Sequence, residues 1–392
     1  MDIAILGAGV AGIATAITLK KKGFSVSVYE QRPKPETIGA GVVLWPNASF
    51  VIDQLGLTEQ ISAIAGQPKE MARFTDKGEK LGAIDIEALD RHMGYTSYSI
   101  LRRDLQDVLL EELKRNQIEI RYDHRVSGFR SLAEGRTAVV FEHGLTINPD
   151  LIIGADGRMR SVAREYVLGD NSPVYQGFIN WIGTVETEQP ILTEENVFDF
   201  WGQGERFGIV PISDRKLYWG AAATCKQALK TGPLDDKAEL KARFNRWPDP
   251  IRQIIEQTAL ADIRAIYVHD HDPVSRWHKD NVLLIGDAAH APLPTSGQGA
   301  CQALEDAWVL AEHLNRQSED LETQLTGFTQ QRFHKTSAIT HGARSLARSL
   351  FDEDRKNIQQ RNESAKEMDY QAMADGMAKG WGSGLPLGAS EN

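Results

Sequence analysis

Residues 7–12, Gly-Ala-Gly-Val-Ala-Gly, constrain the fold of this chain more than any other stretch of its sequence. They follow an apolar, β-rich run at residues 2–6 and lead into residues 12–22, whose composition is typical of a helix. Residues 24–29 then alternate as a strand does. A strand, a glycine turn, a helix and a second strand in this order predict a β-α-β unit at the start of a parallel, doubly wound sheet.

The glycines of this turn have the spacing that binds a dinucleotide. The first permits a tight turn, the second lets a pyrophosphate approach the backbone, and the third allows the helix to pack closely on the strand. The helix N-terminus offers free N–H groups to the phosphates, and an acid at the end of the second strand can accept hydrogen bonds from ribose hydroxyls. The residues expected to contact the dinucleotide here are Gly7, Gly9, Gly12, Glu30, Gln31 and Arg32.

Length and charge narrow the class of protein. The chain has 392 residues, which suits two domains, and its net charge of −10 argues against a nucleic-acid partner. The two cysteines, Cys225 and Cys301, lie far apart without zinc-ligand spacing, as expected in a reducing cytoplasm. The apolar run 3–19 has Asp2 before it and lysines after it, the reverse of a secretory signal. We therefore expect a cytoplasmic protein with no membrane span.

The order of the remaining elements implies that the first domain is interrupted. A nucleotide-type unit opens the chain, short β-rich runs separated by turns fill residues 175–225 as in an antiparallel sheet, and a buried parallel strand returns at 281–285. Other expected elements are helices at 101–116 and 236–259, strands at 118–122, 137–142 and 150–154, and helix from 299 almost to a frayed end at 383–392.

We therefore expect an α/β fold with a discontinuous Rossmann-type nucleotide-binding domain and an inserted substrate domain with a mixed or antiparallel sheet. The first domain is expected to comprise residues 1–72, 98–170 and 274–330, the second residues 73–97 and 171–273, and a C-terminal helical segment residues 331–392.

Two later motifs identify the dinucleotide. Asp156-Gly157 ends the strand at 150–154 and precedes Ser161 and Arg164, and Gly286-Asp287 ends the strand at 281–285. Either motif alone is a common strand-to-loop joint. Together with the glycine turn and in this order, they resemble the flavoprotein aromatic hydroxylases, which are single-component FAD monooxygenases with the p-hydroxybenzoate hydroxylase fold. The resemblance covers roughly residues 1–330.

The resemblance implies how the chain binds FAD. Asp287 would bind a ribityl or ribose hydroxyl, and Asp156-Gly157 would help to hold both FAD and the reduced nicotinamide. Arg102 would lie near the pyrophosphate, with Arg103 as the alternative if the register is shifted by one residue. A helix beginning near residue 300 would point its N-terminus at flavin N1 and O2. The further FAD contacts implied are Gly41, Val42, Gln106, Gly286, Pro294, Gly297, Gly299 and Ala300.

Several stretches resemble the urate hydroxylase and salicylate hydroxylase-like branch of this family, among them GAGVVLWPNA, YQGFINWIG, GERFGIVPI, KLYWG and GLPLG. This resemblance implies that Arg206 and Tyr218 contact the substrate, although Arg206 could instead form a surface salt bridge. Thr295 occupies the position of an acid in the urate-hydroxylating members, and threonine cannot act as a base at neutral pH. The substrate is therefore expected to be phenolate-like already, or a different heteroaromatic ring.

The implied activity is an FAD-dependent monooxygenase that uses NADH or NADPH and O2 to hydroxylate a small aromatic or heteroaromatic substrate through a C4a-hydroperoxyflavin. The nicotinamide would bind transiently, because the sequence has no second G-x-G-x-x-G motif. The alternatives are an FAD-dependent oxidase or epoxidase acting on a non-aromatic substrate, and a non-catalytic flavin-binding protein. The ring, the hydroxylation position, the choice of reductant, and monomer or homodimer stay open.

Three further stretches have competing interpretations. Residues 269–272, His-Asp-His-Asp, look like a metal cluster, but alternate residues of a strand face opposite sides, so no metal is expected there. His290 could be catalytic, although packing within its loop is the favoured role. Residues 39–41, Gly-Ala-Gly, could be a plain hinge or the flavin-contacting loop that the family resemblance implies.

Overall fold

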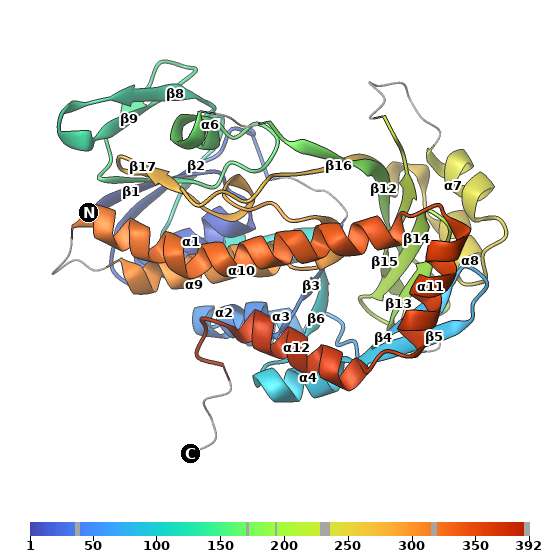
Figure 1. The fold of residues 1–392 in the computed structure, drawn as a ribbon. Helices are drawn as coiled ribbons and strands as arrows, with labels where there is room; N and C mark the ends of the chain where they lie inside the picture. Colours follow the sequence, from blue (N-terminus) through green and yellow to red (C-terminus); the bar gives the residue numbers. More distant parts are fainter. Residues whose placement is uncertain (36–39, 170–171, 193, 228–235, 315–319, 388–392) are drawn as a thin grey trace.

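The computed structural model describes residues 1–35, 40–169, 172–192, 194–227, 236–314 and 320–387, and it confirms the mixed α/β fold. A six-stranded sheet and a seven-stranded sheet lie in opposite halves of the molecule (Figure 1). The long helix α10 (Leu321–Leu350) runs along both halves.

The six-stranded sheet has the order β17-β18-β11-β1-β2-β7, and all of its pairs are parallel except β17 with β18. The register places Leu6 beside Gly154, and Gly154 beside Leu284. The carboxyl ends of three strands far apart in the sequence therefore meet at one edge. The strands are β1 (Asp2–Leu6), β2 (Ser25–Tyr29), β7 (Ile120–Arg121), β11 (Leu151–Gly154), β17 (His278–Lys279) and β18 (Val282–Leu284).

The helices α1 (Val10–Lys21) and α9 (Gly299–His313) pack against each other in this half. Nine of the first ten residues of α1 are buried, so the largely apolar sequence of this stretch reflects burial on all sides. The other helices and small sheets of this half are α2 (Pro46–Leu55), α3 (Thr58–Ser62), α5 (Arg102–Arg115), α6 (Val162–Leu168), the pair β3 (Gly41–Leu44) with β6 (Tyr98–Leu101), and β8 (Val126–Ser131) with β9 (Thr137–Phe141) and β10 (Thr146–Ile147).

The seven-stranded sheet has the order β16-β12-β15-β14-β13-β4-β5. Its outer face carries Trp181, Phe207 and Trp219, which pack on helices α7 (Asp236–Phe244) and α8 (Ile251–Gln257). Its inner face meets the other half, because Ala222 shares an apolar cluster with Leu293. The strands are β4 (Glu70–Thr75), β5 (Lys80–Asp85), β12 (Val174–Glu186), β13 (Val197–Trp201), β14 (Glu205–Pro211), β15 (Lys216–Thr224) and β16 (Ile263–Asp270).

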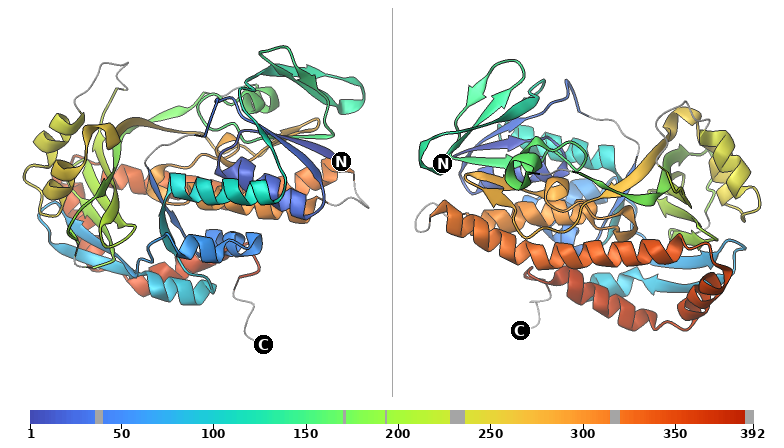
Figure 2. Two further views of the ribbon diagram at one scale, coloured as in Figure 1. Left: turned by 180° about the vertical axis from the view of Figure 1, so that it is seen from behind. Right: turned by 45° about the horizontal axis from the view of Figure 1, so that its top comes forward.

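The C-terminal segment forms α10, α11 (Arg355–Lys366) and α12 (Tyr370–Gly382), and α12 returns along α4 (Ile86–Met93). Figure 2 shows α10 from two further directions, lying along both halves of the molecule. Within the described ranges, no helix combines the length and the apolar character needed to cross a membrane.

One expected element differs from what is observed. The helix expected at 236–259 is two helices, because Pro248 and Pro250 lie between Phe244 and Ile251, and a proline has no N–H for a continuous helix. The second sheet is mixed, which lies within the expected mixed or antiparallel class: β12 to β15 pair antiparallel, and β13 also pairs in parallel with β4. That pair joins a segment from before residue 98 to the strands after residue 171, which is why local alternation did not reveal it.

Candidate active site

The three motifs come into contact at the carboxyl edge of the six-stranded sheet. A Cβ on Gly7, which has a φ of +112°, would lie 2.3 Å from the carbonyl oxygen of Ala155. A Cβ on Gly286 would lie 2.8 Å from the side chain of Ala11. Glycine is therefore required at both positions, because each lets one motif touch the next.

The backbone is open where a cofactor would need to approach it. A Cβ built on Gly9, Gly157 or Gly299 would meet nothing within 4 Å. By contrast, a Cβ on Gly12 would lie 2.0 Å from the carbonyl oxygen of Gly7, so this glycine is needed for helix packing. The three open glycines lie on different motifs, and this arrangement fits a long dinucleotide such as FAD.

Glu30 has the placement that a ribose would require. Its carboxylate is buried at the end of β2 and accepts hydrogen bonds from the N–H groups of Ala8 and Arg32, both at 2.9 Å. These bonds fix the carboxylate beside the glycine turn. The side chain of Gln31 is turned outward to Arg125, whose Nη1 lies 2.6 Å from Gln31 Oε1.

Two arginines act on the charge of Asp287. Its carboxylate accepts hydrogen bonds from Nε and Nη2 of Arg158 at 3.0 and 2.8 Å. Burial opposes the charge of Asp287, but Arg158, with smaller contributions from Arg102 and His290, lowers the pKa of this carboxyl. Arg102 is thus close enough to act on Asp287, whereas Arg103 pairs with the adjacent Asp104 on the surface.

The side chain of Asp156 is engaged in the local structure. It accepts hydrogen bonds from Oγ of Ser161 at 2.5 Å and from the N–H of Ala163 at 3.1 Å, and burial raises its pKa. Ser161 in turn caps α6. Arg164, one turn along this helix, donates to the carbonyl oxygens of Ala288 and Ala289 at 2.8 and 3.1 Å, so the second motif holds the third in place.

A buried ion network lies beneath the turn that follows Gly286. The carboxylate of Asp306 accepts from the N–H of Gly286 at 2.7 Å, and it contacts Nε2 of His290 at 2.6 Å and Nε of Arg332 at 2.7 Å. Burial opposes its charge, but His290 and Arg332 lower the pKa of Asp306 to about 2. The ring of His290 also packs on Trp277, so its contacts are those of a loop-packing residue.

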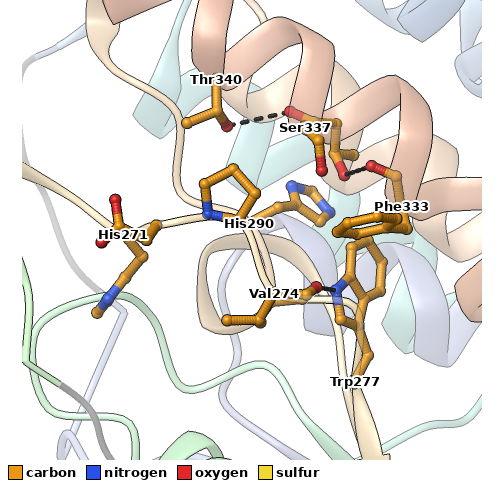
Figure 3. A pocket seen from close by; sticks show the side chains of 11 residues that line it. His271, Val274, Trp277, His290, Phe333, Ser337 and Thr340 are labelled. Carbon is orange, nitrogen blue, oxygen red and sulfur yellow. Dashed lines mark hydrogen bonds between the residues drawn. The ribbon is translucent and has the colours of Figure 1, made fainter.

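A small cavity lies behind the same turn. Figure 3 shows that His290, Trp277 and Phe333 gather around it, together with Ser337 of α10. Its volume is about 10 Å³, which is about the size of one water molecule. Nδ1 of His290 and Oγ of Ser337 have no hydrogen-bond partner among the described residues. The cavity has a mixed polar and apolar lining and is too small for an aromatic substrate.

The turn at the N-terminus of α9 is held from its other side by the C-terminal segment. Nε1 of Trp45 donates to the carbonyl oxygen of Gly297 at 3.1 Å, and the Trp45 ring packs on Trp381 of α12 at 5.1 Å. Nζ of Lys335 reaches Glu305 of α9 and the carbonyl oxygens of Trp381 and Ser383. The helix end expected to face the flavin is therefore fixed by contacts from α2, α10 and α12.

On the opposite side of this edge, the seven-stranded sheet presents Arg206 and Tyr218. Nε of Arg206 lies 2.6 Å from Oδ1 of Asp199, so Arg206 forms a salt bridge with a buried carboxylate while its own side chain is 27% exposed. Burial raises the pKa of Tyr218, and the positive charge of Arg206 partly offsets this. A Cβ on Gly41 would lie 2.4 Å from the Tyr218 ring, so β3 of the first half packs directly on the tyrosine.

The remaining expected residues lie around this junction. Nε2 of Gln106 donates to the carbonyl oxygen of Ala8 at 3.2 Å, and Oγ1 of Thr295 donates to that of Ala343 at 2.9 Å. Val42 lies in β3, Pro294 begins a short helix before Gly297, and Ala300 lies in the first turn of α9. Gly39 lies outside the described residues.

The His-Asp-His-Asp stretch at 269–272 is bound to protein groups. Asp270 accepts two hydrogen bonds from Arg344 of α10, at 2.7 and 2.9 Å, and Asp272 accepts one. Nε2 of His271 lies 2.7 Å from the carbonyl oxygen of Arg158. Across the described part of the chain, no group of three or more His, Cys, Asp or Glu side chains is arranged to hold a metal ion.

Sequence reasoning missed Arg158 and Asp199, which pair with the expected Asp287 and Arg206. It also missed Arg332 and Lys335 of α10, which bind Asp306 and Glu305 of α9. The sequence did offer a signal for Arg158, because it directly follows the Asp156-Gly157 motif. The other three had no local signal, because each pairs with a residue on a different element.

Comparisons with known proteins agree with this geometry. Residues 1–331 match the family described as FAD binding domain. The chain is 32% identical to an aurachin C monooxygenase/isomerase of Stigmatella aurantiaca over 81% of this chain and 82% of that one. It is 29% identical to an FAD-dependent urate hydroxylase of Klebsiella pneumoniae over 99% of this chain and 100% of that one. Its structure resembles that of Klebsiella pneumoniae HpxO complexed with FAD and uric acid, with a TM-score of 0.90, 27% identity, and 98% and 97% of the two chains covered.

Proposed function

Because the chain belongs to the FAD binding domain family, we propose that it is an FAD-dependent monooxygenase that uses NADH or NADPH and O2 to hydroxylate a small aromatic or heteroaromatic ring. The observation that carries this proposal is the contact of three glycine-containing motifs at one sheet edge, opposite Arg206 and Tyr218. Two free cysteines support a reducing compartment such as the cytoplasm.

We assign the FAD-holding residues from their placement. Gly9 and the N-terminus of α1 would receive the pyrophosphate, Glu30 the adenosine ribose, and Asp287 a ribityl hydroxyl. The N-terminus of α9, beginning at Gly299, would direct N–H groups and a partial positive charge to the flavin. Bound FAD supplies the oxygen-activating redox chemistry.

The protein's own contribution is to orient the ring and exclude water. Arg206, held by Asp199, would donate hydrogen bonds to an acceptor on the substrate. Tyr218 would donate or accept a hydrogen bond while its pKa stays above the ordinary value. The segment from Pro294 to Gly299 would close one side of the site, limiting access of water to the reacting atoms.

The substrate should not need a base at residue 295. The Thr295 hydroxyl donates to a backbone carbonyl and cannot take up a proton at neutral pH. We therefore infer that a ring already activated for hydroxylation is preferred over urate.

The test begins with the purified protein reconstituted with FAD. NADH and NADPH are each offered with a panel of phenols, pyridines, quinolones and purines, and NAD(P)H oxidation is measured together with hydroxylated product by mass spectrometry. The proposal expects a yellow protein whose reductant consumption rises with one ring class and yields its hydroxylated product. A non-aromatic product would favour the oxidase or epoxidase alternative, and a protein whose flavin neither reductant bleaches would indicate a non-catalytic flavin-binding protein.

A further inference from the structure

The inner face of the seven-stranded sheet has two glycines at its centre. Gly208 of the middle strand β14 and Gly220 of its neighbour β15 are directly paired. A Cβ on Gly208 would meet only backbone oxygens, at 3.8 and 4.0 Å, and neither glycine has a positive φ. Ordinary residues would fit this backbone, so fold geometry does not require glycine here.

Side chains surround these glycines on all sides. Two residues along each strand, the register places Arg206 opposite Ala222 at one end and Val210 opposite Tyr218 at the other. On the flanking strands, Ile182 pairs with Gly220 and Asp199 with Gly208. The frame is about 13 Å by 14 Å between backbones, from the usual strand rise and spacing. The flanking and end positions are Ile182, Asp199, Arg206, Val210, Tyr218 and Ala222.

The bare centre lies on the face of the sheet that meets the first half. Ala222 packs with Leu293 of the loop before α9, and the Tyr218 ring packs against Gly41 of β3. The Tyr218 hydroxyl lies 3.6 Å from where a Cβ on Gly220 would be, so it overhangs one edge of the glycine pair. On the outer face, behind the glycines, Trp181, Phe207 and Trp219 pack in an apolar cluster, so the two strands cannot shift outward.

The charge at this site is compensated. Asp199 is buried and accepts from Nε of Arg206 at 2.6 Å and from Nε1 of Trp201 at 2.8 Å. Arg206 therefore presents hydrogen-bond donors to the frame while its charge is matched by an adjacent carboxylate. A carbonyl or ring nitrogen can accept those donors, whereas a carboxylate would also be repelled by Asp199.

We propose that Gly208 and Gly220 form a flat floor on which the substrate ring lies, and that the Arg206–Asp199 pair selects an uncharged planar ring bearing a carbonyl or ring-nitrogen acceptor. This inference rests on the proposed function and identifies the substrate class of the same site. Because both glycines tolerate a methyl group structurally, their lack of side chains is explained by the thickness of the ring above them.

The floor is tested with Gly208→Ala, which adds one methyl group to the middle of the surface on which the ring would lie. Dissociation constants are measured by equilibrium dialysis on the FAD-loaded protein, with salicylamide and quinoline-2-carboxamide as planar probes. The dissociation constant of at least one probe is expected to rise tenfold or more, with FAD content and melting temperature unchanged. Gly128→Ala is the matched control, because Gly128 lies in strand β8 and a Cβ there would meet nothing within 4 Å. Wild-type affinity in Gly208→Ala, or no binding of either probe to wild type, overturns the floor.

The charge assignment is tested with Asp199→Asn and the matched anions, salicylate and quinoline-2-carboxylate. Wild type is expected to bind each amide more tightly than its carboxylate, and Asp199→Asn to reverse or reduce that preference at least fivefold. The charge assignment is overturned if Asp199→Asn keeps the wild-type preference for amides, or if the wild type prefers the carboxylates. These outcomes are separate from failure of the proposed function, because binding is measured without turnover. If the protein hydroxylates a ring but Gly208→Ala leaves probe affinity unchanged, only the floor is refuted.

Discussion

Replacing Asp306 by asparagine should remove a measurable, pH-dependent part of the stability of the fold. The carboxylate is fully buried, and burial opposes its charge, yet His290 and Arg332 lower its pKa from 3.8 to about 2. Each tenfold change in proton affinity corresponds to about 1.4 kcal/mol, so the ionised carboxylate stabilises the folded protein by about 2 kcal/mol at neutral pH.

The sign follows from the direction of that pKa shift. A depressed carboxyl pKa gives stability that is fully present above the unfolded-state pKa near 4 and is lost as the pH falls toward 2. The asparagine side chain of the variant takes up no proton in this range. The wild type should therefore be more stable than Asp306→Asn by at least about 2 kcal/mol at pH 7, and this difference should shrink between pH 5 and pH 3.

The assay is urea unfolding of the FAD-loaded protein, followed by tryptophan fluorescence at several pH values from 3 to 7. Asp214→Asn is the matched control, because Asp214 is exposed and its one ion pair within the described part of the chain is with the neighbouring Arg215. Its effect should stay within about 0.5 kcal/mol at every pH. If the curves for wild type and Asp306→Asn run parallel over this range, the charge of Asp306 does not stabilise the turn and the reasoning fails.

Three other perturbations have expected outcomes. Gly9→Ala should fold normally but lose FAD, whereas Gly12→Ala should lose both stability and FAD, because only the second Cβ would strike the backbone; melting temperature and bound flavin distinguish them. Trp45→Phe removes the donor to the Gly297 carbonyl, worth about 1 kcal/mol, and should raise the FAD dissociation constant about fivefold in a fluorescence titration. Burial raises the pKa of Cys301 to about 12, so a thiol reagent at pH 8 should label the half-buried Cys225 but label Cys301 only after unfolding.

The first half of the fold could be predicted because its signals are local. Each of the three motifs follows a short apolar run, and such a run that ends in Gly-Asp or a glycine turn marks the carboxyl end of a buried strand. Parallel strands end at the same edge of a sheet, so the contacts of Gly7 with Ala155 and of Gly286 with Ala11 follow from the positions of these motifs at strand ends.

For the half that holds Arg206 and Tyr218, the sequence indicated which residues matter but not how they pair. That Arg206 faces inward follows from alternation, but its pairing with Asp199 depends on the register of β13 against β14, and the glycine pair depends on β14 against β15. No spacing in the sequence sets these registers. The break between α7 and α8 is different, since Pro248 and Pro250 gave a local signal that the helical composition of 236–259 concealed.

The C-terminal helices, which had no assigned role from sequence, connect the two sides of the site. Arg332 of α10 binds Asp306 beneath the flavin-facing half, and Arg344 of the same helix binds the buried Asp270 at the edge of the seven-stranded sheet. Twelve residues of continuous helix separate the two arginines, or about 18 Å. Because a helix of this length changes little in length, the two ion pairs fix the distance between the two halves. The two halves are therefore held relative to each other by α10 as well as by direct contacts such as Ala222 with Leu293.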